Sequence, residues 1–324
     1  MVRRSIRALV LLVAGCGAGA AQDIGTLNPK PLPPIANPAD PKAPAKELFG
    51  RRITPLPSST PHSIGYYTSG CLVGAMALPI NGPNWQVMRL SRNRNWGHPN
   101  MIRFLERFAA KVPSIGWRGL LVGDMAQPRG GPMLTGHWSH QVGLDADIWL
   151  TPMPNRRLSR QEREEMMATN VVNDQWTDVR PEIWSPKYIA FYKLAAQDPE
   201  VERVLVNPAI KKALCRDVSG DRSWLHKIRP VLGHNYHTHI RISCPKDSPH
   251  CKPQPATPLD EGCGKDLEWW FKPKPRQLMV KPGGVSRAIP MSALPAACRQ
   301  VVLAPEQPLP RHSEQAGQAE QLPN

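Results

Sequence analysis

The chain has 324 residues, of which 41% are hydrophobic and 21% charged, and it contains 37 prolines and ten tryptophans. This length and hydrophobic fraction suffice for a buried core in one large domain or two modest ones, which excludes a wholly disordered chain. The sequence has no apolar run of about 18 residues or more, which excludes a polytopic membrane protein. The net charge of +15 favours anionic partners without identifying one.

The N-terminus is typical of an export signal. Arginines precede a short apolar stretch at residues 8–15, and small residues follow, so residues 1–21 are expected to be a secretory signal peptide. The same stretch resembles a lipoprotein cleavage box at Cys16. Cleavage there would leave a lipid-anchored protein, whereas cleavage near Ala21 would leave a soluble one, and both alternatives stay open. Either route leads to an oxidising compartment.

Three further regions follow the signal. Residues 22–62 are rich in proline and lack periodicity, which predicts an extended linker or a strap over the domain surface. Residues 63–303 have a globular composition and are expected to form the folded domain. Residues 304–324 are mainly polar and are expected to be a disordered tail.

Helix and strand signals alternate along the domain and predict an α+β fold. Helices are expected at 98–112, after the capping box of Ser159 and Glu162, from Ser185, and after the N-capping Asn207. Strands are expected at 119–122, 144–148, 201–206 and 236–243.

Six cysteines remain once Cys16 is assigned to the signal region. They are Cys71, Cys215, Cys244, Cys251, Cys263 and Cys298. Six cysteines allow about 15 pairings. No CxxC motif is present, so three structural disulfides are favoured over a zinc knuckle.

Five of the ten histidines lie in two short groups, GHWSHQVGLDADI at 136–148 and HNYHTHI at 234–240. His237 and His239 are two residues apart on a predicted strand, so their side chains point to one face. Asp145 and Asp147 share the polar face of another predicted strand, and His140 precedes it.

These residues suit a catalytic zinc site, which takes three protein ligands and keeps one position open for water. We expect His140, Asp147 and His239 to bind Zn²⁺, because imidazole and carboxylate suit this ion where thiols are tied up as disulfides. His237 would then act as the general base, since zinc lowers the pKa of its water to about 7.

Three neighbouring side chains receive supporting roles. His137 and His234 would flank the site and could hydrogen-bond a tetrahedral oxyanion. Asp145 is either a hydrogen-bonding partner of a ligand histidine or a carboxylate that is solvated or salt-bridged, and both alternatives stay open.

The pattern His140-x6-Asp147 with His237-x-His239 resembles the zinc signature of the LAS metallopeptidases, which include lysostaphin-like enzymes, D-Ala-D-Ala carboxypeptidases and hedgehog-like domains. Residues 136–148, 206–215 and 224–244 further resemble the penicillin-insensitive murein endopeptidases, as do the WGHP motif at 96–99 and the cysteine spacing. The resemblance covers roughly residues 63–302.

This resemblance implies a periplasmic zinc hydrolase with a central antiparallel sheet and flanking helices, similar to hedgehog-like and D-Ala-D-Ala-peptidase-like domains and stapled by disulfides. It implies cleavage of the D-alanyl–diaminopimelyl cross-links of peptidoglycan without a serine nucleophile. By position, it implies that His140, Asp147 and His239 are the zinc ligands and His237 the base. His137 and His234 match accessory active-site histidines. The implied disulfides are Cys71–Cys298, Cys215–Cys263 and Cys244–Cys251.

His137 also matches a contact to a second, looser metal. Some relatives carry additional Asp and His residues that contact metal, in the segment that matches Val171 and its neighbours. This chain has Asn170 and Asn173 there, and this departure argues against a second metal site.

Cross-linked peptides carry free carboxylates, which arginine can bind. We expect Arg129, upstream of His137, to make such a contact, with a solvated loop arginine as the alternative. Gly130-Gly131 lacks the lysine and hydroxyl residue of a phosphate loop, so nucleotide binding is rejected, and an exported location does not fit nucleic-acid binding. The competing functions are a zinc carboxypeptidase that removes terminal D-Ala and a non-catalytic cell-wall-binding protein.

Overall fold

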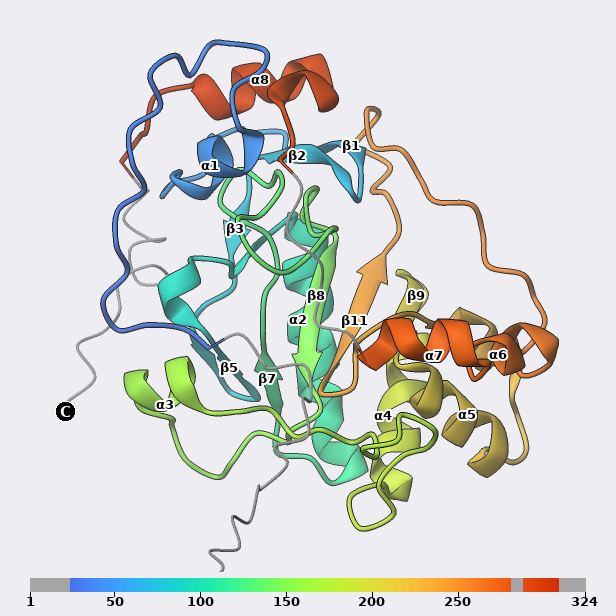
Figure 1. Cartoon of the computed structure of the whole chain (residues 1–324). Helices are drawn as coiled ribbons and strands as arrows, with labels where there is room; N and C mark the ends of the chain where they lie inside the picture. The colour runs from blue at the N-terminus through green and yellow to red at the C-terminus, as the bar shows by residue number, and fades with distance from the viewer. Residues whose placement is uncertain (1–23, 281–287, 309–324) are drawn as a thin grey trace, which may run out of the picture.

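The computed structural model describes residues 24–280 and 288–308. The expected signal peptide at 1–21 and residues 309–324 of the expected tail lie outside the described residues. The fold is α+β, as the sequence predicts, with helices gathered around one large sheet and a smaller helical layer at the top of the view in Figure 1.

The large sheet has seven strands in the order β10-β9-β11-β8-β7-β5-β4. Its strands are β4 (Asn81–Gly82), β5 (Trp85–Val87), β7 (Leu120–Val122), β8 (Asp145–Trp149), β9 (Val201–Val206), β10 (Ile228–Pro230) and β11 (His237–Ile242). The four central strands pair antiparallel, whereas β10 with β9 and β5 with β7 pair parallel. The sheet is therefore mixed, with antiparallel pairs at its centre and between β4 and β5, and the expected central antiparallel sheet is not confirmed.

Strands β8 and β11 lie side by side at the middle of this sheet (Figure 1). Ala146 and Ile148 of β8 and Ile240 of β11 alternate into the main core, so the residues between them face the other way. The register sets His239 opposite Asp147 and Arg241 opposite Asp145. Because a slip by one residue would expose the buried set, the apolar alternation fixes this register.

Three helices pack on the apolar side of the sheet: α2 (Pro99–Lys111), α4 (Pro186–Ala196) and α5 (Pro208–Asp217). α2 is one residue shorter at each end than the predicted helix. His98 is its N-cap and accepts a hydrogen bond from the Asn100 backbone, and Val112 is its C-cap, where a 3-10 helix begins. The predicted caps of α3 (Arg160–Glu165) and α5 both form. The buried faces of these helices and the sheet make up the main hydrophobic core.

A second, smaller core joins the two ends of the described chain. Leu48 and Phe49 of α1 (Ala45–Gly50) pack with Val301 and Val302 of α8 (Ala296–Leu303). The hairpin of β1 (His62–Tyr66) and β2 (Ser69–Val73) lies against them. A separate two-stranded sheet forms where β3 (Met76–Ala77) pairs with β6 (Trp96–Gly97). Part of the proline-rich segment therefore packs into the domain.

The packed chain also continues beyond residue 303. The Glu306 carboxylate accepts hydrogen bonds from the backbone and hydroxyl of Thr54. The first residues of the expected disordered tail are thus held against the domain.

Three disulfides form, with the pairs that the resemblance implied: Cys71–Cys298, Cys215–Cys263 and Cys244–Cys251. The first links β2 to α8 across 227 residues of sequence, and the second links α5 to the segment before α6 (Lys265–Trp269) and α7 (Pro273–Val280). All six cysteines outside the signal region are therefore oxidised.

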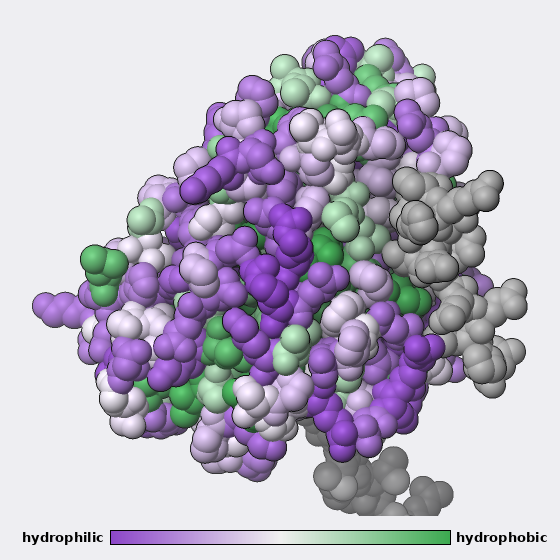
Figure 2. All heavy atoms as spheres, turned by 180° about the vertical axis from the view of Figure 1, so that it is seen from behind, coloured by the Kyte–Doolittle hydropathy of each residue, from purple (hydrophilic) through white to green (hydrophobic). Residues whose placement is uncertain are grey.

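Hydrophilic side chains predominate on the face seen in Figure 2, with hydrophobic atoms scattered between them. Within the described ranges, no helix is both long and apolar enough to cross a bilayer.

Candidate metal centre

The side chain of Asp147 lies at the centre of a buried cluster of histidines, on the face of the sheet opposite the main core. Its carboxylate oxygens lie 3.2 Å from His137 Nδ1, 3.4 Å from His140 Nε2 and 3.3 Å from His239 Nδ1. His237 Nε2 is 3.6 Å from the same carboxylate. The structure thus brings the two histidine groups of the sequence together around one aspartate.

The carboxylate of Asp145 connects the two histidine groups by contacting one residue of each, His140 and His239. Its carboxylate accepts a hydrogen bond from the His140 backbone N–H at 2.9 Å and lies 2.9 Å from His239 Nε2. Arg241 donates to both of its oxygens, at 2.7 and 3.1 Å. Asp145 is fully buried and therefore not a solvated carboxylate. Of the alternatives left open by the sequence, it is both salt-bridged, to Arg241, and in contact with a candidate ligand histidine, His239.

The backbone at His140 is in the left-handed region, with φ of +70°. A side chain rarely adopts this conformation, so the surrounding structure must hold it. The bond from the His140 N–H to Asp145 supplies such a restraint, and it turns the imidazole toward Asp147.

Several polar atoms at the centre of the cluster are buried without a hydrogen-bond partner among the described residues. They are both ring nitrogens of His140 and Oδ1 of Asp147. Unpaired buried polar atoms are rare and costly, and a ligand is one of the explanations they call for. Nitrogen and carboxylate oxygen are a donor set that Zn²⁺ accepts. The residues therefore fit a bound divalent ion.

Within the described residues, one group of three side chains has ligand atoms that all lie within 4.8 Å of one another, namely His137, His140 and Asp147. This group contains two of the three ligands expected from the sequence. His239 lies beside it, with its ring centroid 4.5 Å from that of His140.

The histidines differ in charge because their surroundings differ. Burial lowers the pKa of His237 to about 4, against the attraction of the Asp147 carboxylate, so this ring is neutral at neutral pH. Burial also disfavours the charged form of His239, but the carboxylates of Asp145 and Asp147 outweigh it and raise its pKa to about 9. Burial would raise the pKa of Asp147, yet the neighbouring histidines hold it well below its usual value.

His137 is held between two carboxylates. Nε2 lies 3.0 Å from Asp124 and Nδ1 3.2 Å from Asp147. Burial alone would lower the pKa of His137, but Asp147 and Asp124 raise it. Asp124 is in turn paired with Arg92 and Arg94, at 2.9 and 2.7 Å, which fixes the orientation of the His137 ring.

His234 lies at the edge of the cluster, with its ring centroid 4.8 Å from that of His237. Its Nδ1 is 2.8 Å from the Leu232 carbonyl, which can only accept, so Nδ1 carries the proton. Burial and the neighbouring histidines hold the pKa of His234 well below its usual value, which leaves Nε2 as an acceptor. The expected donation from His234 to an oxyanion does not fit this arrangement.

A narrow cleft of about 100 Å³ opens onto the cluster. Besides His137, Asp147 and His237 it is lined by Arg89, Arg92, Gly123, Asp124, Gly136, Trp149 and Tyr236. The sequence reasoning missed the arginines, Asp124 and the two aromatic residues. Trp149 and Tyr236 adjoin the predicted motif residues, whereas Arg89, Arg92 and Asp124 lie far from them in sequence.

The prediction that Arg129 contacts substrate is wrong. Its side chain is fully buried, and it donates to the backbone carbonyls of Thr54, Val301 and Pro305 at 3.1, 2.9 and 3.0 Å. An arginine that binds several carbonyls in this way ties the N-terminal segment to α8 and has no surface to offer a ligand.

A family model described as penicillin-insensitive murein endopeptidase matches residues 63–303. The chain belongs to this family. Penicillin-insensitive murein endopeptidases that it resembles include one from Haemophilus influenzae, 44% identical over 259 residues, which are 78% of this chain and 86% of the relative. One from Yersinia enterocolitica is 42% identical, over 78% of this chain and 89% of the relative. One from Escherichia coli is 43% identical, over 72% and 84%.

The structural role of Arg129 predicts the effect of replacing it. Arg129→Met leaves several buried carbonyls without donors and should lower the free energy of unfolding by about 3 kcal/mol. Arg103→Met, at an exposed position on α2, should change it by less than about 0.5 kcal/mol. Urea unfolding followed by tryptophan fluorescence measures both. An Arg129 variant that unfolds at the wild-type urea concentration would contradict this role.

Proposed function

We propose that the chain is a zinc-dependent murein endopeptidase that hydrolyses the D-alanyl–diaminopimelyl cross-links of peptidoglycan. The observation that carries the proposal is the buried cluster in which His140 and His239 meet Asp147, with the neutral His237 beside them on the cleft. Membership of the murein endopeptidase family supports the substrate class. The hedgehog-like and D-Ala-D-Ala-peptidase-like character of the domain stays a prediction.

His140, Asp147 and His239 would hold the zinc ion. The unpaired atoms of His140 and Asp147 are buried, and Nδ1 of His239 lies 3.3 Å from Asp147. The cysteines that would compete for zinc are oxidised to disulfides. Bound there, zinc would supply a Lewis acid for the scissile carbonyl and lower the pKa of a water molecule. Asp145 would keep the His239 ring in place through its contact with Nε2.

His237 is the proposed general base. A base must be unprotonated before it acts, and the low pKa of His237 keeps its imidazole neutral. The ring lines the cleft, so it can take a proton from water positioned beside Asp147 and pass it to the leaving amine. The carboxylates of Asp147 and Asp124 raise the pKa of His137, which favours its protonated form, and the ring is placed to stabilise the negative charge that develops on the scissile carbonyl oxygen.

The cleft also offers a positive charge for the carboxylates of the substrate. Arg92 lines it beside His137 and is paired with Asp124, with 15% of its side chain exposed. Arg89 is buried and donates to the backbone carbonyls of Arg163, Glu164 and Met166, so it is not available to substrate. Arg92 therefore suits a carboxylate of a peptide cross-link better than Arg129 does. We place the enzyme in the periplasm, either soluble or held by a lipid at Cys16, on the N-terminal sequence.

A digest of purified muropeptides tests the proposal. The full-length protein should convert cross-linked dimers to monomers, lose this activity after thorough chelation and regain it with Zn²⁺, with the products identified by mass spectrometry. Uncross-linked pentapeptides should keep their terminal D-Ala. Loss of D-Ala from pentapeptides alone would identify a carboxypeptidase instead. Dimers that stay uncut would favour a cell-wall-binding role, and cleavage that survives metal removal would contradict the mechanism.

His237→Ala should separate proton transfer from metal binding. Because general-base catalysis contributes about 10²–10⁴-fold, kcat on cross-linked dimers should fall by at least that range. The zinc content should stay near that of the wild type, since His237 is not a proposed ligand. His226→Ala, in the 3-10 turn Ser223–Lys227 and outside the cleft, serves as the matched control. Wild-type turnover by the His237 variant would remove this residue as the base.

A further inference from the structure

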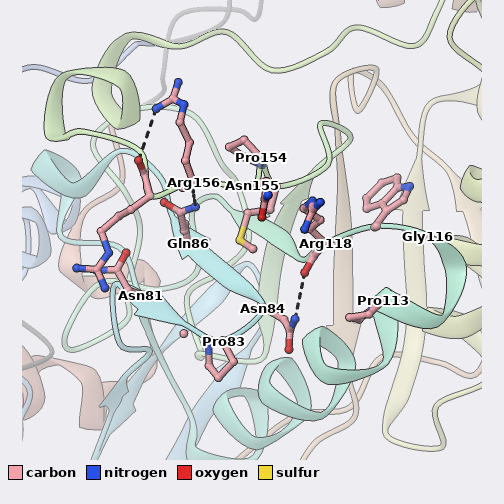
Figure 3. A pocket seen from close by; sticks show the side chains of 14 residues that line it. Asn81, Pro83, Asn84, Gln86, Pro113, Gly116, Arg118, Pro154, Asn155 and Arg156 are labelled. Carbon is pink, nitrogen blue, oxygen red and sulfur yellow. Dashed lines mark hydrogen bonds between the residues drawn. The ribbon is translucent and has the colours of Figure 1, made fainter.

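A larger groove of about 730 Å³ lies apart from the metal centre, at the end of the sheet where β7 begins and the chain leaves β8. Figure 3 shows its walls, which come from the turn between β4 and β5, the approach to β7, and the loop that follows β8. No side chain of the histidine cluster lines it, and the function proposed above does not use it.

The groove is strongly basic. Arg118, Arg156 and Arg157 line it, and the described residues that form its walls include no aspartate or glutamate. Arg156 is paired with Glu162 outside the groove, and the side chains of Arg118 and Arg157 are exposed. Asn84 and Asn155 add amide groups. Guanidinium and amide donors that line one groove are typical of a surface that recognises acidic peptides.

The walls of the groove are tied together by hydrogen bonds between distant segments. Asn84 Nδ2 donates to the Arg118 carbonyl at 3.1 Å. Gln86 Nε2 donates to the Arg156 carbonyl at 2.9 Å, and Gln86 Oε1 accepts from the Leu158 backbone at 2.8 Å. The arginines are therefore carried on anchored backbone.

The groove and the cleft share one face of the sheet. In the pairing of β7 with β8, Val122 lies opposite Ile148, so Leu121 lies opposite Trp149. In the pairing of β5 with β7, Gln86 lies opposite the same Leu121. Trp149 lines the cleft and Gln86 lines the groove. The two residues are thus two strands apart, which is about 10 Å. A polymer bound in the cleft could reach the groove with a neighbouring part of the same molecule.

We propose that this groove binds a carboxylate-bearing peptide of the murein polymer that neighbours the cross-link in the cleft. The inference rests on the proposed function for the identity of the polymer. Binding at a second place raises the effective concentration of the next cross-link without changing the reaction itself. The groove should therefore matter for the intact polymer and not for a small soluble fragment.

Co-sedimentation of the full-length protein with isolated sacculi tests this. The double variant Arg118→Glu/Arg157→Glu should bind sacculi about tenfold more weakly than the wild type. The control Arg103→Glu/Lys246→Glu makes the same change in net charge at exposed positions outside the groove and should bind within about twofold of the wild type. Both double variants should cut soluble cross-linked dimers at the wild-type rate.

Equal binding of the two double variants to sacculi would overturn the inference. So would a groove variant that keeps its affinity for sacculi and loses binding to phosphatidylglycerol vesicles, since the groove would then recognise a phosphate surface. If the wild type cuts no dimers while the groove variant still loses sacculus binding, the groove inference stands and the proposed hydrolysis falls.

Discussion

The antiparallel pairing of β8 with β11 is the constraint on which the site depends. It sets Asp147 opposite His239 and Asp145 opposite Arg241. Because side chains alternate along a strand, all four of these residues share one face while Ala146, Ile148 and Ile240 fill the core on the other. The same apolar residues that stabilise the sheet therefore determine where the polar groups meet.

Buried carboxylates are costly unless they are paired, and each one here is paired. Asp145 is held by Arg241 and the His140 backbone, and Asp124 by Arg92 and Arg94. Asp147 alone is surrounded only by imidazoles. The two arginine-bound aspartates thus orient His239 and His137, and Asp147 is left with an unpaired oxygen in the middle of the cluster.

The side-chain alternation and the capping residues in the sequence predicted most of the strands and helix starts around the site. The alternation at 144–148 and 236–243 located β8 and β11, and the capping residues located the starts of α3 and α5. The same alternation placed His237 and His239 on one face. Pairing direction at the sheet edges was not predictable, because it depends on how the chain returns between strands and not on side-chain pattern.

Arg129 was misassigned for a related reason. Nothing in its neighbourhood in the sequence indicates that Thr54 and Val301, which lie far from it along the chain, supply carbonyls around its guanidinium. Arg92 and Asp124 were missed because their link to His137 exists only after folding. Spacing within one segment can reveal a ligand pattern, whereas contacts between segments require the fold.

X-ray absorption spectroscopy of the zinc-loaded full-length protein tests the central claim most directly. We expect only nitrogen and oxygen neighbours at about 2.0–2.1 Å, and a signal from two imidazoles that loses one of them in either His140→Ala or His239→Ala. A first shell that contains sulfur, or a spectrum that neither substitution changes, would contradict the assignment of these residues to one ion.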